Sequence, residues 1–514
     1  MTFPRSFIAL ILFCICAGIV SANDTHPFVE GELLVKFGKN SADKAAKVSR
    51  LKAGPSLLEE LKGTEWQRIR LPKGMSMEEA IRLYEKDPSV EAVQPNFYYR
   101  LLATPNDPQY SSSGLYGLQN ISAPAAWDLS TGSPDVVVAV IDTGIRLTHE
   151  DLAANIWTNS GEIPGNGIDD DGNGFIDDVY GWDFRYDDND PSDQHGHGTH
   201  VAGTIGAVGN NGLGVVGVNW NVRLMAIKIY SPSGTDTTSA MLINAYNYVR
   251  MMKERGVNIR VTNNSYGGCG EACGYDHATR EAIDALGEAG ILNVFAAGNN
   301  NRNTDSVPFY PGSYDLPGIL NVANSNSLDQ RNSTSNYGVV SVDLAAPGTG
   351  ILSTTNGSDS SYGGSSGTSM AAPHVAGAAA LLAAHRPDLS ASSLKATLMN
   401  SVDVLPAWNG LVKTGGRLNV AAALSSPTVC TAEVEAESLF IGTKGGVFSI
   451  DASMPQNCDY SVRGEYFWIQ PLTRSASGTQ TVQFRVSLNN TIFRSGYLRI
   501  GDKQIQITQS RGGK

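Results

Sequence analysis

Ser369 is the residue whose neighbours best suit it to act as a nucleophile. It lies in the segment GTSMAAPH, which opens a run of small apolar residues that extends to Leu382. Such a run predicts a buried helix, and Pro373 is tolerated in its first turn. A serine hydroxyl is a weak nucleophile at neutral pH, so it needs a base and a site that stabilises the oxyanion. At a helix N-terminus the Ser369 N–H would face that oxyanion.

Two upstream residues, Asp142 and His197, have the types needed to activate a serine. Asp142 ends the unbroken apolar run 136–141, which is typical of a strand buried on both faces of a parallel sheet. His197 begins the segment HGTHVAGT, which enters a second helix of small residues. In these roles His197 would take the Ser369 proton, and Asp142 would orient the imidazole and stabilise its charged form.

These three segments resemble the aspartate, histidine and serine motifs of the subtilisin-like serine proteases, in that family's chain order. The resemblance implies a serine endopeptidase with an α/β fold, a doubly wound and mostly parallel sheet. It also implies that Asn299, in the segment FAAGN, donates its amide to the oxyanion, although such Asn-rich segments are also common turns. The same match makes His200 a packed residue without chemistry.

Three other functions use similar residues. An α/β-hydrolase esterase would need a Gly-x-Ser-x-Gly elbow and the order Ser, Asp, His, but Ala371 occupies the second glycine position. A carboxyl-serine peptidase would have acidic residues in place of His197. A binding protein built on an inactive protease scaffold is the second hypothesis for the whole chain, and the intact set of three residues argues against it.

The chain of 514 residues is too long for one ordinary domain. Residues 1–22 place Arg5 ahead of the apolar stretch 7–20 and end in VSA, which predicts a cleaved secretion signal. A membrane anchor is the alternative, but the apolar stretch is short. We therefore expect an extracellular or periplasmic protein.

The formal net charge is −12, and it is unevenly spread: residues 1–103 are slightly basic, whereas residues 104–514 carry −14. An acidic mature protein argues against nucleic-acid binding and favours secreted solubility or calcium binding. We expect protein or peptide substrates and a monomer.

Four cysteines lie outside the leader, an even number that is compatible with two disulfides. The expected pairs are Cys269–Cys273 and Cys430–Cys458, which would contribute roughly 2 and 3.5 kcal/mol by loop closure. The first pair could instead bind a metal, but no further Cys or His completes a tetrahedral set.

Residues 23–103 are expected to form a separate small domain. Strands are predicted at 32–37, 66–71 and 90–93, and helices at 41–51 and from the capping box at Ser76 through Lys86. This order resembles the ferredoxin-like inhibitory propeptides of subtilisin-like enzymes. The chain would then be a zymogen inhibited by its own propeptide, with self-cleavage near Ala103–Thr104. An accessory domain is the alternative.

An acidic segment, DDDGNGFIDD, offers clustered oxygen atoms for calcium. Tyr180 stands where a calcium loop usually has its bidentate Glu, so a nearby Asp would have to complete the ligand set. Similar insertions in the family bind calcium, whereas a solvated acidic turn is the alternative. The expected ligands are Asp169, Asp171, Asn173, the Phe175 carbonyl, and Asp177 or Asp178.

The family resemblance implies a second calcium site, which ties the mature N-terminus to a loop after the histidine helix. Carried onto this chain, its ligands would be Asp107, Asp151, the Asn211 side chain, and the carbonyls of Leu213 and Val215.

The segment NNSYGG, which contains Ser265, Tyr266 and Gly267, resembles the edge strand that pairs with an extended substrate. The pocket for the residue before the scissile bond would be walled by this segment and by residues 296–298. Phe309 aligns with the pocket floor, and a large floor would favour a small substrate residue.

The catalytic domain is expected over 104–427, and residues 428–514 shift to Val, Ile, Thr, Phe and Tyr in alternating strands, which predicts a β-sandwich. Cys430, Cys458, Trp468 and the QIQITQ ending resemble BACON-type Ig-like modules. The resemblance implies carbohydrate or surface contact, and a spacer or folding aid is the alternative.

Overall fold

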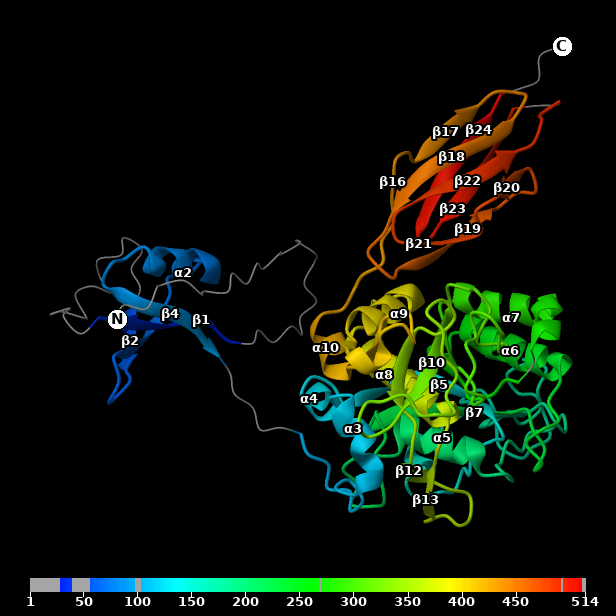
Figure 1. The fold of residues 1–514 in the computed structure, drawn as a ribbon, viewed down its shortest axis with the longest axis horizontal. Helices are drawn as coiled ribbons and strands as arrows, with labels where there is room; N and C mark the ends of the chain where they lie inside the picture. Colours follow the sequence, from blue (N-terminus) through cyan, green and yellow to red (C-terminus); the bar gives the residue numbers. More distant parts are fainter. Residues whose placement is uncertain (1–27, 39–55, 98–102, 269, 491–492, 511–514) are drawn as a thin grey trace. The chain divides into compact units, whose positions relative to one another are not determined.

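The computed structural model describes residues 28–38, 56–97, 103–268, 270–490 and 493–510 (Figure 1). The chain divides into two compact units, residues 1–101 and 102–514. The predicted leader 1–22, the predicted helix 41–51 and Cys269 lie outside the described residues. Among those described, no helix combines the length and apolarity that a membrane crossing requires.

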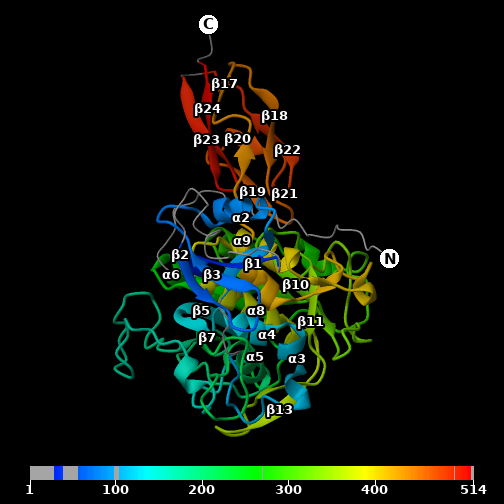
Figure 2. The ribbon, with the colours of Figure 1, turned by 90° about the vertical axis from the view of Figure 1, so that its left-hand side faces the viewer.

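The first unit is an antiparallel sheet in the order β2-β3-β1-β4. Within the described residues of this unit, one helix, α2, packs on the sheet (Figures 1 and 2). The Ser76 hydroxyl accepts from the Glu79 N–H at its start, as the capping box predicts. The bounds are β1 (Phe28–Phe37), β2 (Ser56–Glu60), β3 (Trp66–Arg70), α2 (Met77–Glu85) and β4 (Val90–Phe97).

The second unit contains a nine-stranded sheet, parallel except at the pair β14–β15. In sheet order the strands are β14 (Asp403–Val404), β15 (Gly416–Arg417), β11 (Leu344–Pro347), β10 (Ile319–Ser325), β9 (Leu292–Ala296), β8 (Ile259–Asn264), β5 (Gly132–Asp142), β7 (Asn221–Lys228) and β6 (Gly181–Asp183). A separate hairpin joins β12 (Ile351–Thr354) and β13 (Tyr362–Ser365).

Helices cover both faces of this sheet because its central strands are apolar on both sides. Alternate residues of β5 enter two different cores: Val138 and Val140 pack with α5 and α8, whereas Ala139 and Ile141 pack with α6 and α7. The doubly wound α/β fold is confirmed. The helices are α3 (Tyr116–Asn120), α4 (Ala123–Trp127), α5 (His197–Gly206), α6 (Ser239–Glu254), α7 (His277–Glu288), α8 (Thr368–His385), α9 (Ala391–Asn400) and α10 (Val420–Ser425).

The C-terminal module consists of two sheets that face one buried core, a β-sandwich as predicted. Trp468 is buried in that core. The disulfide Cys430–Cys458 is present, with its Cα atoms 5.6 Å apart. One sheet has the strand order β16 (Glu433–Val434), β18 (Gly446–Ser453), β22 (Gln480–Val486) and β20 (Ile469–Pro471). The other has the order β17 (Ser438–Ile441), β24 (Lys503–Gln509), β23 (Arg494–Ile500), β19 (Asp459–Gly464) and β21 (Ser475–Ser477).

Candidate active site

One cavity of about 210 Å³ collects the four residues predicted to carry the chemistry: Asp142, His197, Asn299 and Ser369. Asp142 is the last residue of β5, at the carboxyl edge of the sheet. His197 is the first residue of α5, and Ser369 is the second residue of α8. The two helices therefore direct their N-termini, the positive ends of their dipoles, at the place where the strand ends.

The pair Asp142 and His197 has the geometry expected of an acid that orients an imidazole. The Nδ1 atom of His197 donates to Oδ1 of Asp142 at 2.7 Å, and Asp142 is only 1% exposed. Burial alone would lower the pKa of His197, but the Asp142 charge and hydrogen bond outweigh it and raise this pKa above 6.5. The remaining nitrogen, Nε2, is the one left to accept a proton from a substrate-side group.

The Ser369 hydroxyl makes a different hydrogen bond from the one the sequence leads us to expect. It donates to the carbonyl oxygen of Ser265 at 3.0 Å. Within the described residues it makes no hydrogen bond to His197, although both line the same cavity. Hydrogen bonds among such groups are often loose before a substrate arrives, and a χ1 rotation redirects the hydroxyl.

A second pair of hydrogen bonds fixes the backbone of Ser369. The hydroxyl of Ser265 donates to the Ser369 carbonyl at 2.9 Å, and the Asn263 amide donates to that hydroxyl at 2.9 Å. The sequence pointed to Ser265 only as part of the segment that pairs with substrate and walls its pocket. Its side chain instead holds the start of α8 in place.

Asn299 is held by one side of its amide. Its Oδ1 atom accepts from the Thr368 N–H at 2.9 Å and from the Thr368 hydroxyl at 3.2 Å. Because the carbonyl side is engaged, the NH₂ group is the part of the side chain left for a ligand in the cavity. This is the orientation that an oxyanion donor requires.

Asp193 is a site residue that sequence reasoning missed. Its buried carboxylate ties the turn after Asp142 to the start of α5, and so sets the position of His197. The sequence signal was an acidic side chain just ahead of a helix start, which is a capping pattern. The Asp193 carboxylate accepts five hydrogen bonds: from the Thr143 hydroxyl at 2.9 Å, from the N–H groups of His195, Gly196 and Thr199 at 2.8 to 2.9 Å, and from the Thr199 hydroxyl at 2.6 Å.

His200 is packed away from this chemistry. Its Nε2 atom bonds the carbonyl oxygens of Ile351 and Gly363, at 3.0 and 3.1 Å. Burial lowers its pKa to about 4, so the ring stays neutral. This arrangement fits the structural role expected for it.

The expected substrate pocket has Phe309 as a wall. A Cβ atom placed on Gly267 would lie 2.4 Å from the Phe309 ring, and one placed on Gly298 would lie 2.9 Å from it. The ring therefore fills the space between these two glycines. Tyr266 also lines the cavity, with its hydroxyl bonded to that of Tyr246 at 2.7 Å.

The acidic segment forms a compact cluster, but with a different membership from the one expected. Carboxylate oxygens of Glu162, Asp171 and Asp178 lie within 4.8 Å of one another. Two expected ligands bind backbone N–H groups instead: Asp169 those of Asn173 and Gly174, and Asp177 those of Gly165, Asn166 and Gly167. Glu162, nine residues before Asp171, was not foreseen.

Two amide side chains occupy the space between these carboxylates. Asn173 donates to Asp171 and Asp178 at 3.2 and 2.9 Å, and Asn159 donates to the same pair at 2.9 and 2.8 Å. Each amide oxygen already accepts a backbone N–H, that of Phe175 for Asn173 and that of Gly161 for Asn159, so turning either amide over would break that bond. The oxygens that the cluster offers to a cation are therefore its carboxylates, which suit calcium. Phe175 packs its ring against Trp182 and Tyr248 nearby.

The second expected calcium site brings its polar side chains together. Asp107 is 4% exposed and accepts from the N–H groups of Asn210 and Asn211. Asp151 is fully buried and accepts from the Asn211 amide at 2.8 Å and the Val215 N–H at 2.9 Å. The Leu213 N–H is bonded to the Asn211 Oδ1 atom. Burial, with a further contribution from the charge of Asp107, raises the pKa of Asp151 to about 6.

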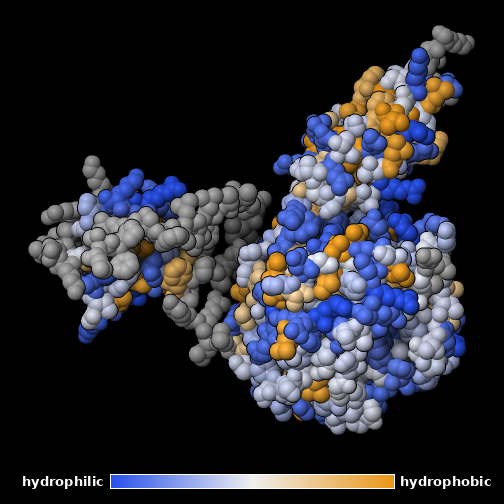
Figure 3. Space-filling view, viewed as in Figure 1, coloured by the Kyte–Doolittle hydropathy of each residue, from blue (hydrophilic) through white to orange (hydrophobic). Residues whose placement is uncertain are grey.

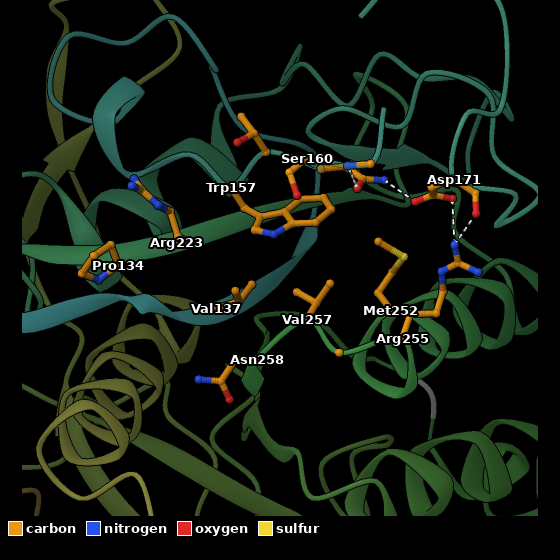
Figure 4. A pocket seen from close by; sticks show the side chains of 14 residues that line it. Pro134, Val137, Trp157, Ser160, Asp171, Arg223, Met252, Arg255, Val257 and Asn258 are labelled. Carbon is orange, nitrogen blue, oxygen red and sulfur yellow. Dashed lines mark hydrogen bonds and ion pairs between the residues drawn. The ribbon is translucent and has the colours of Figure 1, made fainter. Parts of the chain in front are cut away.

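A second cavity, of about 520 Å³, opens at the amino ends of β5 and β7 (Figure 4). Trp157 and Met252 line it, and on one side of it Arg255 donates to Asp171. Its described lining contains no histidine, so it lacks the base that a serine needs. The predicted aspartate, histidine and serine all line the cavity at the carboxyl edge instead.

The chain belongs to the subtilase family, whose profile matches residues 133–427. The fervidolysin N-terminal prodomain matches residues 17–96. Thermitase from Thermoactinomyces vulgaris is 36% identical over 321 residues, which cover 62% of this chain and 99% of thermitase. The thermophilic serine proteinase of Bacillus sp. (strain AK1) is 33% identical over 363 residues, 70% of this chain and 80% of that protein.

The fold is also similar to a solved structure. A protease from Pseudoalteromonas arctica matches 63% of this chain and 99% of its own, with 33% identity and a TM-score of 0.50. The chain is therefore a serine endopeptidase of the subtilisin type with an N-terminal prodomain.

Proposed function

We propose that this protease is a secreted, calcium-stabilised and self-processing zymogen that cleaves proteins through an acyl-enzyme at Ser369. The observation that supports it most is the meeting of Asp142, His197, Asn299 and Ser369 in one cavity. His197 takes the Ser369 proton as the hydroxyl attacks the scissile carbonyl. The Ser369 N–H and the Asn299 amide stabilise the oxyanion, and His197 then protonates the leaving amine. Water attacks the ester in the second half of the cycle.

Labelling with a fluorophosphonate tests the proposed nucleophile directly. This reagent phosphonylates a serine only where a base has activated it. We expect one adduct per active chain, located on Ser369 by peptide mass spectrometry, together with loss of casein hydrolysis. An adduct on another serine, with hydrolysis abolished, would overturn the assignment.

Self-processing is proposed near Ala103–Thr104, with the prodomain as an inhibitor until it is released. Beyond that cut, Asp107 accepts from the N–H groups of Asn210 and Asn211. The segment that would become the new N-terminus thus has an anchorage of its own in the catalytic unit. The protein is proposed to act as a monomer.

A contact with carbohydrate or another surface is proposed for the C-terminal module. Figure 3 shows several apolar patches on its surface, and Tyr466 and Phe467 are 46% and 86% exposed. Contiguous apolar patches on a protein surface commonly mark interaction sites. We expect the full chain to bind insoluble polysaccharide and the variant Phe467→Ala to lose this binding. Equal binding by the wild type and the variant would contradict a role for this surface.

Calcium is proposed to bind the cluster of Glu162, Asp171 and Asp178. At about 100 times its dissociation constant the ion would stabilise the fold by about 2.7 kcal/mol. We expect Glu162→Gln to lose most of the calcium-dependent rise in melting temperature that this site provides, because a neutral side chain cannot balance the positive charge of the ion. Calorimetric titration would count one calcium fewer.

Asp170→Asn is the matched control for that variant. Asp170 lies in the same segment, is exposed, and binds the Ile163 N–H rather than the cluster. It should keep the full calcium response. An equal response in both variants would contradict this site.

Phe309 is proposed to restrict the residue before the scissile bond to small side chains. Phe309→Ala would open the space between Gly267 and Gly298. We expect kcat/KM for peptides with Phe or Leu at that position to rise about 10- to 100-fold relative to Ala peptides, the scale of discrimination by apolar pocket volume. Val307→Ala, at an exposed neighbour outside the cavity, should leave the ratio unchanged. An unchanged ratio in Phe309→Ala would contradict the pocket.

A further inference from the structure

The C-terminal module meets the catalytic domain along helix α9. Ala396, on that helix, is fully buried and belongs to the hydrophobic core of the module. A residue of one domain that completes the core of another is not typical of a flexible tether between them. Figure 1 shows α9 beside the end of the module that carries β19.

A buried ion pair lies next to Ala396. The Lys395 ammonium donates to Asp459, the first residue of β19, at 2.5 Å. The exposed fractions of the two side chains are 5% and 13%. Burial alone would lower the pKa of Lys395, but the carboxylates of Asp343 and Asp459 outweigh it and raise this pKa. Without the module, the Lys395 ammonium would lose the Asp459 carboxylate, which belongs to the module, and a buried charge that loses its partner is destabilising.

The disulfide of the module reinforces the same contact. Cys430 is joined to Cys458, the residue just before Asp459. The Cys430 N–H donates to the Ser393 hydroxyl at 2.9 Å, and the Thr428 N–H donates to the Thr397 hydroxyl at 2.8 Å. The disulfide thus ties together the two segments of the module that grip α9.

Polar contacts extend the surface at its margins. Asn457 donates to the Asn400 side chain at 2.6 Å, at the end of α9. Arg463, on β19, forms an ion pair with Asp284 of α7 at 3.1 Å and another with Glu288. These contacts hold the module at both α9 and α7.

We propose that the C-terminal module is a permanent clamp on α9 and remains part of the mature protease. Helix α9 packs against α8, whose first turn carries Ser369. The clamp holds the two helices together, and its function is to resist local unfolding and the self-digestion that follows from it. Only the protection from self-digestion rests on the proposed proteolytic activity.

Cleavage of the linker tests the clamp without using that activity. A recognition sequence for a foreign protease is inserted between Ser426 and Pro427 of the full-length Ser369→Ala chain. After the cut, no covalent bond joins the module to the rest, because the Cys430–Cys458 disulfide lies within it. We expect the two pieces to elute together in size-exclusion chromatography. Their separation would overturn the proposal.

Asp459→Asn in the same cut chain tests the ion pair. We expect at least a tenfold weaker association and a lower melting temperature for the catalytic domain. Asp451→Asn, at an exposed carboxylate elsewhere in the module, is the matched control and should change neither. Equal association in both variants would overturn the role of this pair. If Asp459→Asn does not fold, the double variant Lys395→Met with Asp459→Leu replaces it. This variant removes both charges together, so no buried charge lacks a partner, and its pieces should associate as those of the cut chain with the natural pair do.

Discussion

Ser369→Ala is expected to remain full length and to lose about six orders of magnitude in kcat, the scale found when the nucleophile of subtilisin is removed. The substitution removes the only atom that can form the acyl-enzyme, while the Asn299 amide and the α8 N-terminus stay in place. The residual rate would come from the oxyanion site and substrate binding alone. Intact mass spectrometry after secretion in calcium, with peptide hydrolysis, measures both effects.

Ser366→Ala is the control for that experiment. Ser366 is exposed, lies three residues earlier, and its hydroxyl accepts from the Gly350 N–H rather than facing the cavity. This variant should process its prodomain and hydrolyse peptides as the wild type does. If the wild type itself stays full length and inactive even after limited trypsin treatment, the chain is a binding protein on a protease scaffold.

The fold and the positions of the four principal residues could be predicted because the signals are local. An apolar run that leads to Asp142, and helix starts at His197 and Ser369, each place one side chain at a strand end or helix start. The fourth residue, Asn299, was assigned through the family resemblance of the segment FAAGN. Parallel strands bring such ends to one edge of the sheet. The structure accordingly brings these residues into one cavity.

The supporting contacts could not be predicted because they depend on distances across the fold. Asp193 meets Thr143 from 50 residues away, and Ser265 meets Ser369 from 104 residues away. The rotamer of Ser369, which directs its hydroxyl to Ser265, leaves no trace in the sequence either. A motif specifies which side chains are present, whereas the packing of distant loops decides which atoms they touch.

The acidic segment shows the same limit at shorter range. The alternating carboxylates predicted that all ligands come from one loop. Asp171 and Asp178 of that loop do lie together. The loop folds back, however, so that Asp177 binds three backbone N–H groups, and Glu162 enters from outside the segment. That acidic side chains gather in this segment was predictable, but the direction of each carboxylate was not.

Asp142→Asn is expected to lower kcat/KM by about 10⁴-fold. It should also move the acid limb of the pH profile of kcat/KM to lower pH. Asparagine can donate to Nδ1 of His197, which favours the tautomer that cannot accept the Ser369 proton. The shift has a definite sign. The Asp142 carboxylate raises the pKa of His197 above 6.5 in the wild type, so hydrolysis is lost as the pH falls through that raised value. Without the charge, burial dominates, and the imidazole stays neutral to a lower pH.

Asp135→Asn separates this effect from a general change in charge or in strand β5. Asp135 lies near the exposed start of the same strand, outside the cavity, and its replacement changes the net charge equally. Its pH profile should match that of the wild type. The profile of kcat/KM from pH 5 to 9 is the measurement for all three proteins. An acid limb that stays in place in Asp142→Asn would mean that a group other than His197 limits the reaction. The 2.7 Å contact between His197 and Asp142 would then be structural, and the search for the base would move to His195, the other histidine that lines the cavity.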